Sequence, residues 1–144
     1  MSTGTPRIRS TDADLTEEFW AATAQHRLVR PVCDDCGRSF FTPRFCCPYC
    51  RCERWAYEQS TGRGRLYSGT VVHRGPDESW PTPYVLVVVD LDEGWTMLSR
   101  LEYENPALVA DGALHERHVQ VTFVPEDRPP FRTLPAFVLV EATP

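Results

Sequence analysis

The first regular pattern along the chain has the spacing of a helix. Side chains that can form one packed stripe recur at three- and four-residue intervals, at Leu15, Phe19, Ala22 and His26. This spacing predicts an amphipathic helix over residues 12–26, after a flexible tail at residues 1–10. Phe19 and Trp20 point to different faces, so we expect the helix to pack on a neighbour, in this chain or in another.

Further along the chain the pattern changes to that of β-strands. Five β-rich runs are separated by turn residues, and they are GRGRLYSGTVVHRG, PYVLVVVDLDEG, WTMLSRLEY, HVQVTFVPE and AFVLVEA. Between the third and fourth runs, Asn105 can cap a short helix that begins at Pro106 and ends at Gly112. Five strands with a helix after the third outline a small Greek-key barrel, the OB-fold. The chain is therefore predicted to be mainly β, with a five-stranded OB-fold barrel at residues 60–142.

A dense group of cysteines lies between these two patterns. A short strand, Leu28 to Val32, leads into VCDDCGRSFFTPRFCCPYC, which holds five of the six cysteines. Ten residues separate two Cys-x-x-Cys pairs, which are Cys33 with Cys36 and Cys47 with Cys50. In each pair the two intervening residues turn the chain so that both sulfurs face one ion, and two such turns complete a tetrahedron of thiolates around zinc. The pattern predicts a closed, structural zinc site in a ribbon at residues 28–55.

Other interpretations of these cysteines stay open at this point. The pairs can be redox dithiols or ordinary buried thiols, although neither explains two identical pairs facing each other across a short loop. The same tetrahedron of thiolates also accepts iron. Cys46 and Cys52 fall outside the repeated spacing, and we interpret them as spare thiols.

Composition narrows the class of protein. With 144 residues, 42% of them apolar, the chain can form a folded domain, and its net charge of −5 lacks the basic character of a general nucleic-acid binder. The N-terminus is polar, without the apolar core of a signal peptide, and the longest apolar run, Val85 to Val89, is too short to cross a bilayer. We therefore expect a cytoplasmic location, where clustered cysteines more often bind metal than form disulfides.

The order of the segments resembles one protein family. An FW-containing helix is followed by RLVRPVCDDCGRSFFTPRFCCPYC, then by STGRGRLYSGTVVHR and PYVLVVVDLDEG. This order resembles the DUF35 family from about Phe19 to Glu141. The resemblance implies a rubredoxin-like zinc ribbon and an OB-fold, with structural zinc at Cys33, Cys36, Cys47 and Cys50. It also implies a non-catalytic accessory or scaffold subunit that binds a thiolase-superfamily enzyme, or another acyl-CoA enzyme such as a hydratase or an aldolase of steroid side-chain breakdown.

A basic rim that contains a glycine is the candidate for contact with acyl-CoA. Arg63 and Arg65 flank Gly64, and His73 and Arg74 close the same strand. Arginine suits the phosphates of CoA because its planar guanidinium matches phosphate oxygens in pairs. The alternative interpretation is a solvated loop beside a barrel strand.

Phe19 and Trp20 are the candidate contacts with a partner protein. They belong to the segment of tail and helix that we assign to residues 1–27. A large apolar side chain that is left over after packing often marks a partner surface. The alternative is that both rings cover the barrel.

No residue is predicted to be catalytic. The four histidines stand alone in the sequence, and Asp90, Asp92 and Glu93 enter a glycine turn, where carboxylates are ordinarily solvated. A second candidate function is the binding of single-stranded nucleic acid by the ribbon and the barrel. Its candidate residues surround the second cysteine pair and are Arg44, Arg51, Arg54, Tyr49 and Trp55. The acidic balance of the chain argues against this function.

Overall fold

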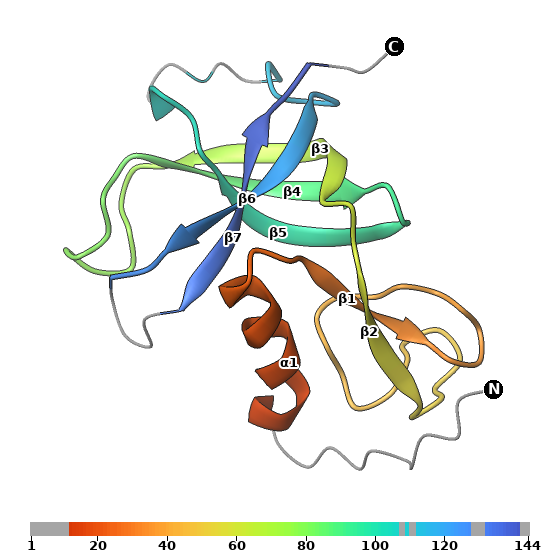
Figure 1. The fold of residues 1–144 in the computed structure, drawn as a ribbon. Helices are drawn as coiled ribbons and strands as arrows, with labels where there is room; N and C mark the ends of the chain where they lie inside the picture. Colours follow the sequence, from red (N-terminus) through yellow and green to blue (C-terminus); the bar gives the residue numbers. More distant parts are fainter. Residues whose placement is uncertain (1–11, 107–108, 110–111, 128–131, 142–144) are drawn as a thin grey trace.

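The computed structural model describes residues 12–106, 109, 112–127 and 132–141. Within them, one helix leads into a two-stranded sheet and then into a closed five-stranded barrel, as Figure 1 shows. The elements in chain order are α1 (Asp12–Ala24), β1 (Val29–Cys33), β2 (Trp55–Gln59), β3 (Arg63–Val72), β4 (Tyr84–Leu91), β5 (Trp95–Leu101), β6 (His118–Pro125) and β7 (Thr133–Leu139). The predicted class, mainly β with an N-terminal helix and a five-stranded barrel, is confirmed.

The helix α1 ends two residues before the predicted residue 26. The N–H of Arg27 donates to the carbonyl of Ala22 (2.9 Å), which closes the last turn, and His26 has a φ of 58°. This is the Schellman arrangement, in which the residue after the cap takes the left-handed conformation. The exposed ring of His26 stacks on Phe123 of β6, with 5.3 Å between the ring centroids. The prediction that His26 belongs to the helical stripe is therefore wrong, because the chain has already left the helix there.

The strands β1 and β2 form an antiparallel hairpin that carries the cysteine ribbon. Their register pairs Val29 with Gln59 at one end and Cys33 with Trp55 at the other. β1 confirms the predicted short strand within one residue at each end. β2 was not predicted, because WAYEQ is short and lacks an alternation of apolar and polar residues. It extends the hairpin to Gln59, beyond the segment 28–55 assigned to the ribbon, and that division of the chain stays a prediction.

The barrel has the strand order β3-β4-β5-β7-β6, and β3 pairs with two neighbours at once. Its first residues pair with β6, and most of its length pairs with β4. Gly64 lies where the two pairings overlap, and a Cβ atom there would lie 2.4 Å from the carbonyl oxygen of Asp90. The glycine is required by the close approach of two strands, so its presence does not indicate a ligand.

The strands β5 and β7 close the barrel through a short contact. They are parallel and share one register pair, Leu101 with Phe137. Beyond that pair the hydroxyl of Ser99 donates to the carbonyl of Pro135 (3.0 Å), and a proline has no N–H to offer the facing strand. This side of the barrel therefore lacks a continuous ladder. We call it the seam, and it consists of residues 97–100 of β5 and 134–136 of β7.

Two predicted features lie wholly or largely outside the described residues. They are the tail at residues 1–10 and the short helix from Pro106 to Gly112, of which residues 107, 108, 110 and 111 are not described. After that segment the chain returns to the barrel at Leu114, whose side chain is buried in the core.

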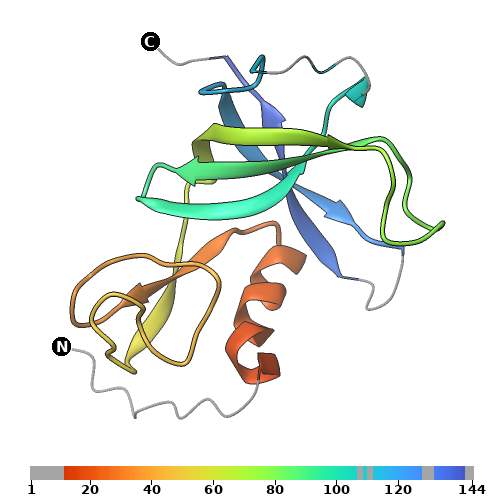
Figure 2. The same cartoon turned by 180° about the vertical axis from the view of Figure 1, so that it is seen from behind.

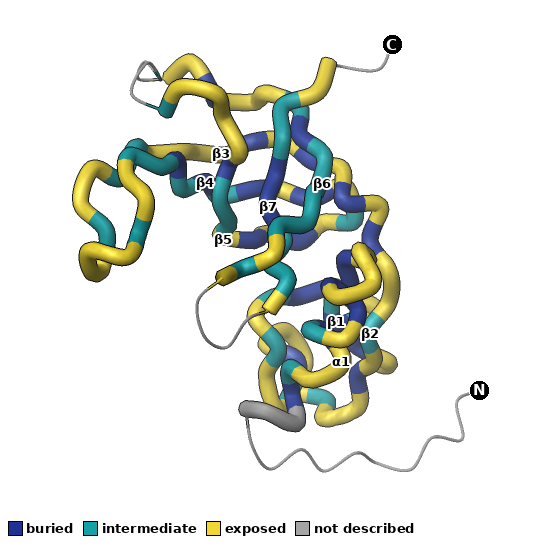
Figure 3. Tube along the Cα trace, turned by 60° about the vertical axis from the view of Figure 1, so that its left-hand side comes forward, coloured by how far each residue is buried: buried dark blue, intermediate teal, exposed yellow. Residues whose placement is uncertain are grey.

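Buried side chains form two clusters, and α1 contributes to both. The barrel cluster holds the inward-facing residues of the barrel strands and Leu114, together with Phe19 and Ala22 of α1 and with Leu28 and Val29 at the start of the hairpin. The ribbon cluster consists of Leu15, Cys33, Phe40, Cys47 and Trp55. Leu15 and Phe19 lie about one helical turn apart, and the hydroxyl of Tyr57 on β2 donates to the carbonyl of Leu15. Figure 2 shows α1 beside the hairpin and below the barrel, and Figure 3 shows buried residues in all three parts.

Candidate metal centre and seam pocket

The structure brings the four predicted cysteine ligands together. Their sulfurs all lie within 4.8 Å of one another, in Cys33, Cys36, Cys47 and Cys50. Cys33 Sγ lies 3.4 Å from Cys50 Sγ. Cys36 Sγ lies 3.6 Å from Cys47 Sγ. Zinc with four Zn–S bonds of about 2.3 Å holds its sulfurs about 3.8 Å apart, so this set of donors fits one tetrahedral ion.

Each cysteine pair lies in a tight turn of the same design. In each turn the first sulfur accepts a hydrogen bond of 3.4 Å from the N–H two residues later. The N–H of Gly37 donates to the carbonyl of Cys33 (3.0 Å), and the N–H of Arg51 donates to that of Cys47 (2.9 Å). Gly37 and Arg51 occupy equivalent positions, with φ of 73° and 67°. The second turn therefore places an arginine in a conformation that favours glycine.

Hydrogen bonding favours the charged form of the most buried sulfur. Burial on its own raises the pKa of Cys47, but the N–H groups of Cys50 and Tyr49 favour the thiolate, and the pKa is lowered to about 7. Burial raises the pKa of Cys33. Metal binding would hold both as thiolates. Four thiolates fill every position of a tetrahedral ion, so such a site stabilises the fold and leaves no position for a substrate.

Cys46 and Cys52 lie outside the group of four sulfurs. Cys52 supports the second turn instead: its carbonyl accepts from the N–H of Cys47 (2.9 Å), and its sulfur accepts from that of Arg54 (3.4 Å). In the part of the chain that the structure describes, no other group of three or more His, Cys, Asp or Glu side chains gathers as these four do.

The two aromatic residues predicted to contact a partner have different surroundings. Phe19 is 4% exposed and packs in the barrel cluster, edge-on to Trp20 with 5.1 Å between centroids. Trp20 is half-buried, and the guanidinium of Arg132 lies 4.9 Å from the centre of its ring. Partner contact stays a prediction for both, and Trp20 offers more surface for it than Phe19.

The residues predicted to contact CoA do not form one site. Arg63 and Arg65 are exposed at the start of β3, whereas His73 and Arg74 are exposed just after its end. A ten-residue strand spans roughly 30 Å. The structure therefore offers two separate basic positions, and contact of either with CoA stays a prediction.

Glu93 is not the solvated turn residue that the sequence suggested. Its carboxylate accepts hydrogen bonds from the Ser60 hydroxyl (2.6 Å), the Thr61 N–H (3.0 Å) and the Trp95 indole N–H (2.9 Å). Although partial burial raises its pKa, these donors outweigh that effect and lower the pKa to about 2. Glu93 therefore fastens the chain between β2 and β3 to the turn between β4 and β5.

One of the proposed nucleic-acid contacts is wrong. Trp55 is 6% exposed, and its ring packs edge-on against Phe40 within the ribbon cluster, with 5.6 Å between centroids. It cannot stack on a base, because almost none of its surface is exposed. Tyr49 is exposed, but the guanidinium of Arg38 lies 4.8 Å from the centre of its ring.

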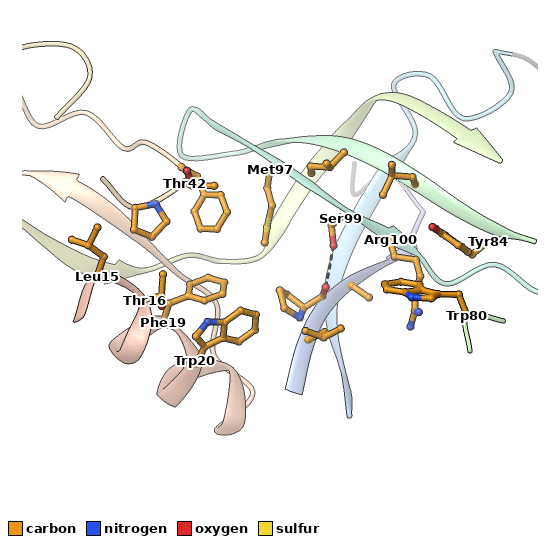
Figure 4. A pocket seen from close by; sticks show the side chains of 17 residues that line it. Leu15, Thr16, Phe19, Trp20, Thr42, Trp80, Tyr84, Met97, Ser99 and Arg100 are labelled. Atoms are coloured by element: carbon orange, nitrogen blue, oxygen red, sulfur yellow. Dashed lines mark hydrogen bonds between the residues drawn. The ribbon is translucent and has the colours of Figure 1, made fainter. Parts of the chain in front are cut away.

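A pocket of about 700 Å³ lies along the seam. We call it the seam pocket, and its lining is Leu15, Thr16, Phe19, Trp20, Phe41, Thr42, Pro43, Trp80, Tyr84, Leu86, residues 97–100 and residues 134–136. Figure 4 shows Phe19 and Trp20 of α1 on one side, Trp80 and Tyr84 on the other, and Met97 between them. Sequence analysis did not predict this pocket, because its walls come from segments that are far apart in the chain.

Comparison with known families matches the ribbon and the barrel separately. Residues 20–54 match the family model described as ChsH2, rubredoxin-like zinc ribbon domain, and residues 57–124 match the one described as ChsH2, C-terminal OB-fold domain. A DUF35 domain-containing scaffold protein of Methanothermobacter thermautotrophicus is 34% identical over 100 residues, which cover 67% of this chain and 75% of that protein. This chain belongs to the DUF35 family. The DUF35 ribbon and OB-fold predicted from the sequence are thereby confirmed.

Other relatives of this DUF35 chain carry more specific names. A protein of Thermomonospora curvata named "Probable enoyl-CoA hydratase alpha subunit" is 36% identical over 84 residues, or 58% of this chain, but the match spans only 26% of that subunit's length. The solved structure named "Ltp2-ChsH2(DUF35) aldolase" has a TM-score of 0.74 and 28% identity, over 91% of this chain and 98% of that one.

A second solved structure shares the fold alone. It is a DUF35-family protein of unknown function from Sulfolobus solfataricus, with a TM-score of 0.56 and 16% identity over 91% of this chain and 87% of that one. Among the described residues, no helix has the length and apolar character needed to cross a membrane.

Proposed function

We propose that this DUF35 chain is a non-catalytic accessory subunit of a thiolase-superfamily enzyme or of another acyl-CoA enzyme, such as a hydratase or an aldolase. The observation that carries the proposal is the likeness to the Ltp2-ChsH2(DUF35) aldolase, which extends over 91% of this chain and 98% of that one. Its name pairs a DUF35 protein with an aldolase. The relatives named as scaffold proteins and as a hydratase subunit support the same role.

Structural zinc is part of this proposal. The four sulfurs have the number, chemistry and spacing of a tetrahedral site, and no position is left open for chemistry. The ion would hold the two turns of the ribbon together in the absence of a large apolar core. Because iron fits the same donors, elemental analysis of purified protein decides between the two metals.

Co-expression tests the accessory role. The chain is produced together with a candidate acyl-CoA enzyme from the same organism, and the mixture is analysed by size-exclusion chromatography and by enzyme assay. We expect co-elution, and higher activity or yield of the enzyme when this chain is present. Independent elution with unchanged enzyme activity would contradict the proposal.

Matched variants locate the contact with the partner. Trp20→Ala on α1 is expected to weaken co-elution, whereas Tyr67→Ala, an exposed aromatic residue on β3, serves as the control. Because Trp20 also packs edge-on against Phe19, melting temperatures check that both variants remain folded under the conditions of the assay. Equal co-elution of the two variants would remove Trp20 from the contact.

Direct contact with acyl-CoA is the finer part of the proposal, and the two basic positions on β3 allow a separate test. Calorimetry with acetyl-CoA compares the wild type with Arg63→Ala/Arg65→Ala and with His73→Ala/Arg74→Ala. The pairs lie at opposite ends of a long strand, so we expect the heat of acetyl-CoA binding to decrease in only one of the two double variants. Identical heats for all three proteins would dismiss both positions.

A further inference from the structure

The seam pocket has the dimensions of a small-molecule site. Its volume is about 700 Å³, within the range of roughly 300–1,000 Å³ that is typical of ligand pockets. It exists because β5 and β7 share a single register pair, Leu101 with Phe137, and then separate. The space between them is bounded by α1 on one side and by the loop before β4 on the other, as Figure 4 shows.

The walls of this pocket suit a hydrocarbon chain. Aromatic rings and aliphatic side chains make up most of the lining, and Leu98 remains 62% exposed at the surface of β5. The hydroxyl of Ser99 is already used, because it donates to the carbonyl of Pro135 (3.0 Å). A sugar or a nucleotide needs several convergent polar partners, whereas most of this lining is apolar.

Positive charge lies at two places on the margin of the pocket. Arg100 lines the pocket and forms an ion pair with Glu102 (2.8 Å). This ion pair uses only some of the five N–H donors of the Arg100 guanidinium. The guanidinium of Arg132 lies over the ring of Trp20, another lining residue, and among the described residues no carboxylate forms an ion pair with it. An apolar interior with cationic groups at its margin complements a molecule that has an apolar chain and an anionic head.

We propose that the seam pocket binds the hydrocarbon chain of a long-chain acyl group, with the anionic head of the molecule at the margin, near Arg100 or Arg132. This inference rests on the proposed function and makes it more specific. It assigns binding of the apolar part of the acyl-CoA to this chain. A free fatty acid and the CoA thioester of the same acid share this chemistry. They differ only in the head, so a binding experiment separates the two sources.

Calorimetry on the full chain with metal bound tests the inference. The ligands are palmitate and palmitoyl-CoA, both below their critical micelle concentrations, and CoA alone. We expect at least one palmitoyl ligand to bind 100-fold or more tightly than CoA, because the chain supplies the affinity. Binding of palmitoyl-CoA but not of palmitate would identify the thioester as the ligand. Binding of palmitate would show that the free acid is sufficient. CoA that binds as tightly as palmitoyl-CoA, or no binding of either palmitoyl ligand, would overturn the inference.

Two substitutions on one face of β5 localise the binding. Leu98→Asp places a carboxylate within the pocket lining, whereas Thr96→Asp places one two residues away on the same exposed face and outside the lining. We expect Leu98→Asp to weaken palmitoyl binding at least tenfold and Thr96→Asp to change it less than twofold. Both positions are exposed, so neither variant is expected to unfold, and melting temperatures check this.

Equal effects of the two substitutions would remove the pocket from the binding site. This measurement uses the isolated chain, so its failure is distinct from failure of the co-elution experiment. A chain that joins an acyl-CoA enzyme without binding palmitoyl ligands would keep the accessory role and lose the acyl site.

Discussion

The ribbon and the barrel are stabilised by different interactions. The ribbon cluster has five buried side chains, two of which are candidate metal ligands, whereas the barrel cluster has fifteen. Burial of apolar surface can therefore stabilise the barrel, but it contributes little to the stability of the ribbon. A structural zinc ion contributes on the order of 10–16 kcal/mol in small modules, which is enough to fix a segment with so small a core. The same treatment should therefore affect the two regions differently.

Removal of the metal should give the largest difference between them. In a strong chelator, or in the variant Cys36→Ser, we expect loss of stoichiometric metal and loss of amide-exchange protection across β1 and β2. Protection of β3 to β7 should be retained, because the ligands all lie in the ribbon. Elemental analysis and hydrogen-exchange mass spectrometry measure both outcomes. A chain that carries no metal and is equally protected in chelator would show that the four thiols do not hold the ribbon.

Truncation of the barrel core should give the reverse result. Phe137 has no exposed surface, and Phe137→Ala is expected to lower the free energy of unfolding by about 3–5 kcal/mol through lost burial and a cavity. The metal content of the folded protein should not change. Val140→Ala, at an exposed position on the same segment, is the control and should cost less than about 0.5 kcal/mol. Equal denaturation midpoints for the two variants would contradict the assignment of the core.

The stability that Glu93 contributes at the junction between the two regions should depend on pH. The pKa of Glu93 lies at about 2 in the folded chain, against an ordinary value of 4.5, so its charged form stabilises the fold. That stabilisation is complete above pH of about 4.5 and is lost as the pH falls towards 2. We expect Glu93→Gln to cost about 1–2 kcal/mol at pH 7, less than the full shift implies because solvent screens this half-exposed group.

Chemical denaturation at several pH values measures this effect. The difference in stability between the wild type and Glu93→Gln should shrink as the pH falls below 4.5. Asp92→Asn, an exposed neighbour in the same turn, is the matched control. A difference that stays constant down to pH 2 would show that the charge of Glu93 does not fasten the junction.

The smallest expected effect lies within the ribbon, between its two turns. Arg51 adopts a φ of 67°, which costs a non-glycine residue a small amount of free energy, and Arg51→Gly should relieve it. We expect a gain of less than about 1 kcal/mol, seen as higher chelator resistance. Gly37→Ala at the equivalent position, where φ is 73°, should lower that resistance instead. Changes of the same sign would show that the turns are not equivalent.

The sequence predicted features that neighbouring residues determine. Two residues between paired cysteines allow both sulfurs to face one ion, so the four candidate ligands could be named from their spacing. The apolar run Val85 to Val89 likewise predicted a β-strand, and it lies within β4.

Features that depend on distant contacts could not be predicted in this way. Whether Glu93 is solvated depends on Ser60, 33 residues earlier in the chain. Trp55 looks like an available stacking surface until Phe40 is seen against it. The seam pocket joins residues from α1, the ribbon loop and three strands, and no local pattern marks such a combination.

The helix α1 has a consequence for the relative orientation of ribbon and barrel. Leu15 packs in one cluster and Phe19 in the other, about one turn apart on a single rigid element. Rotation of α1 about its axis would withdraw both side chains together, so neither region can turn against the other without losing apolar contacts in both. A partner protein that bound α1 would therefore also fix the angle between the ribbon and the barrel.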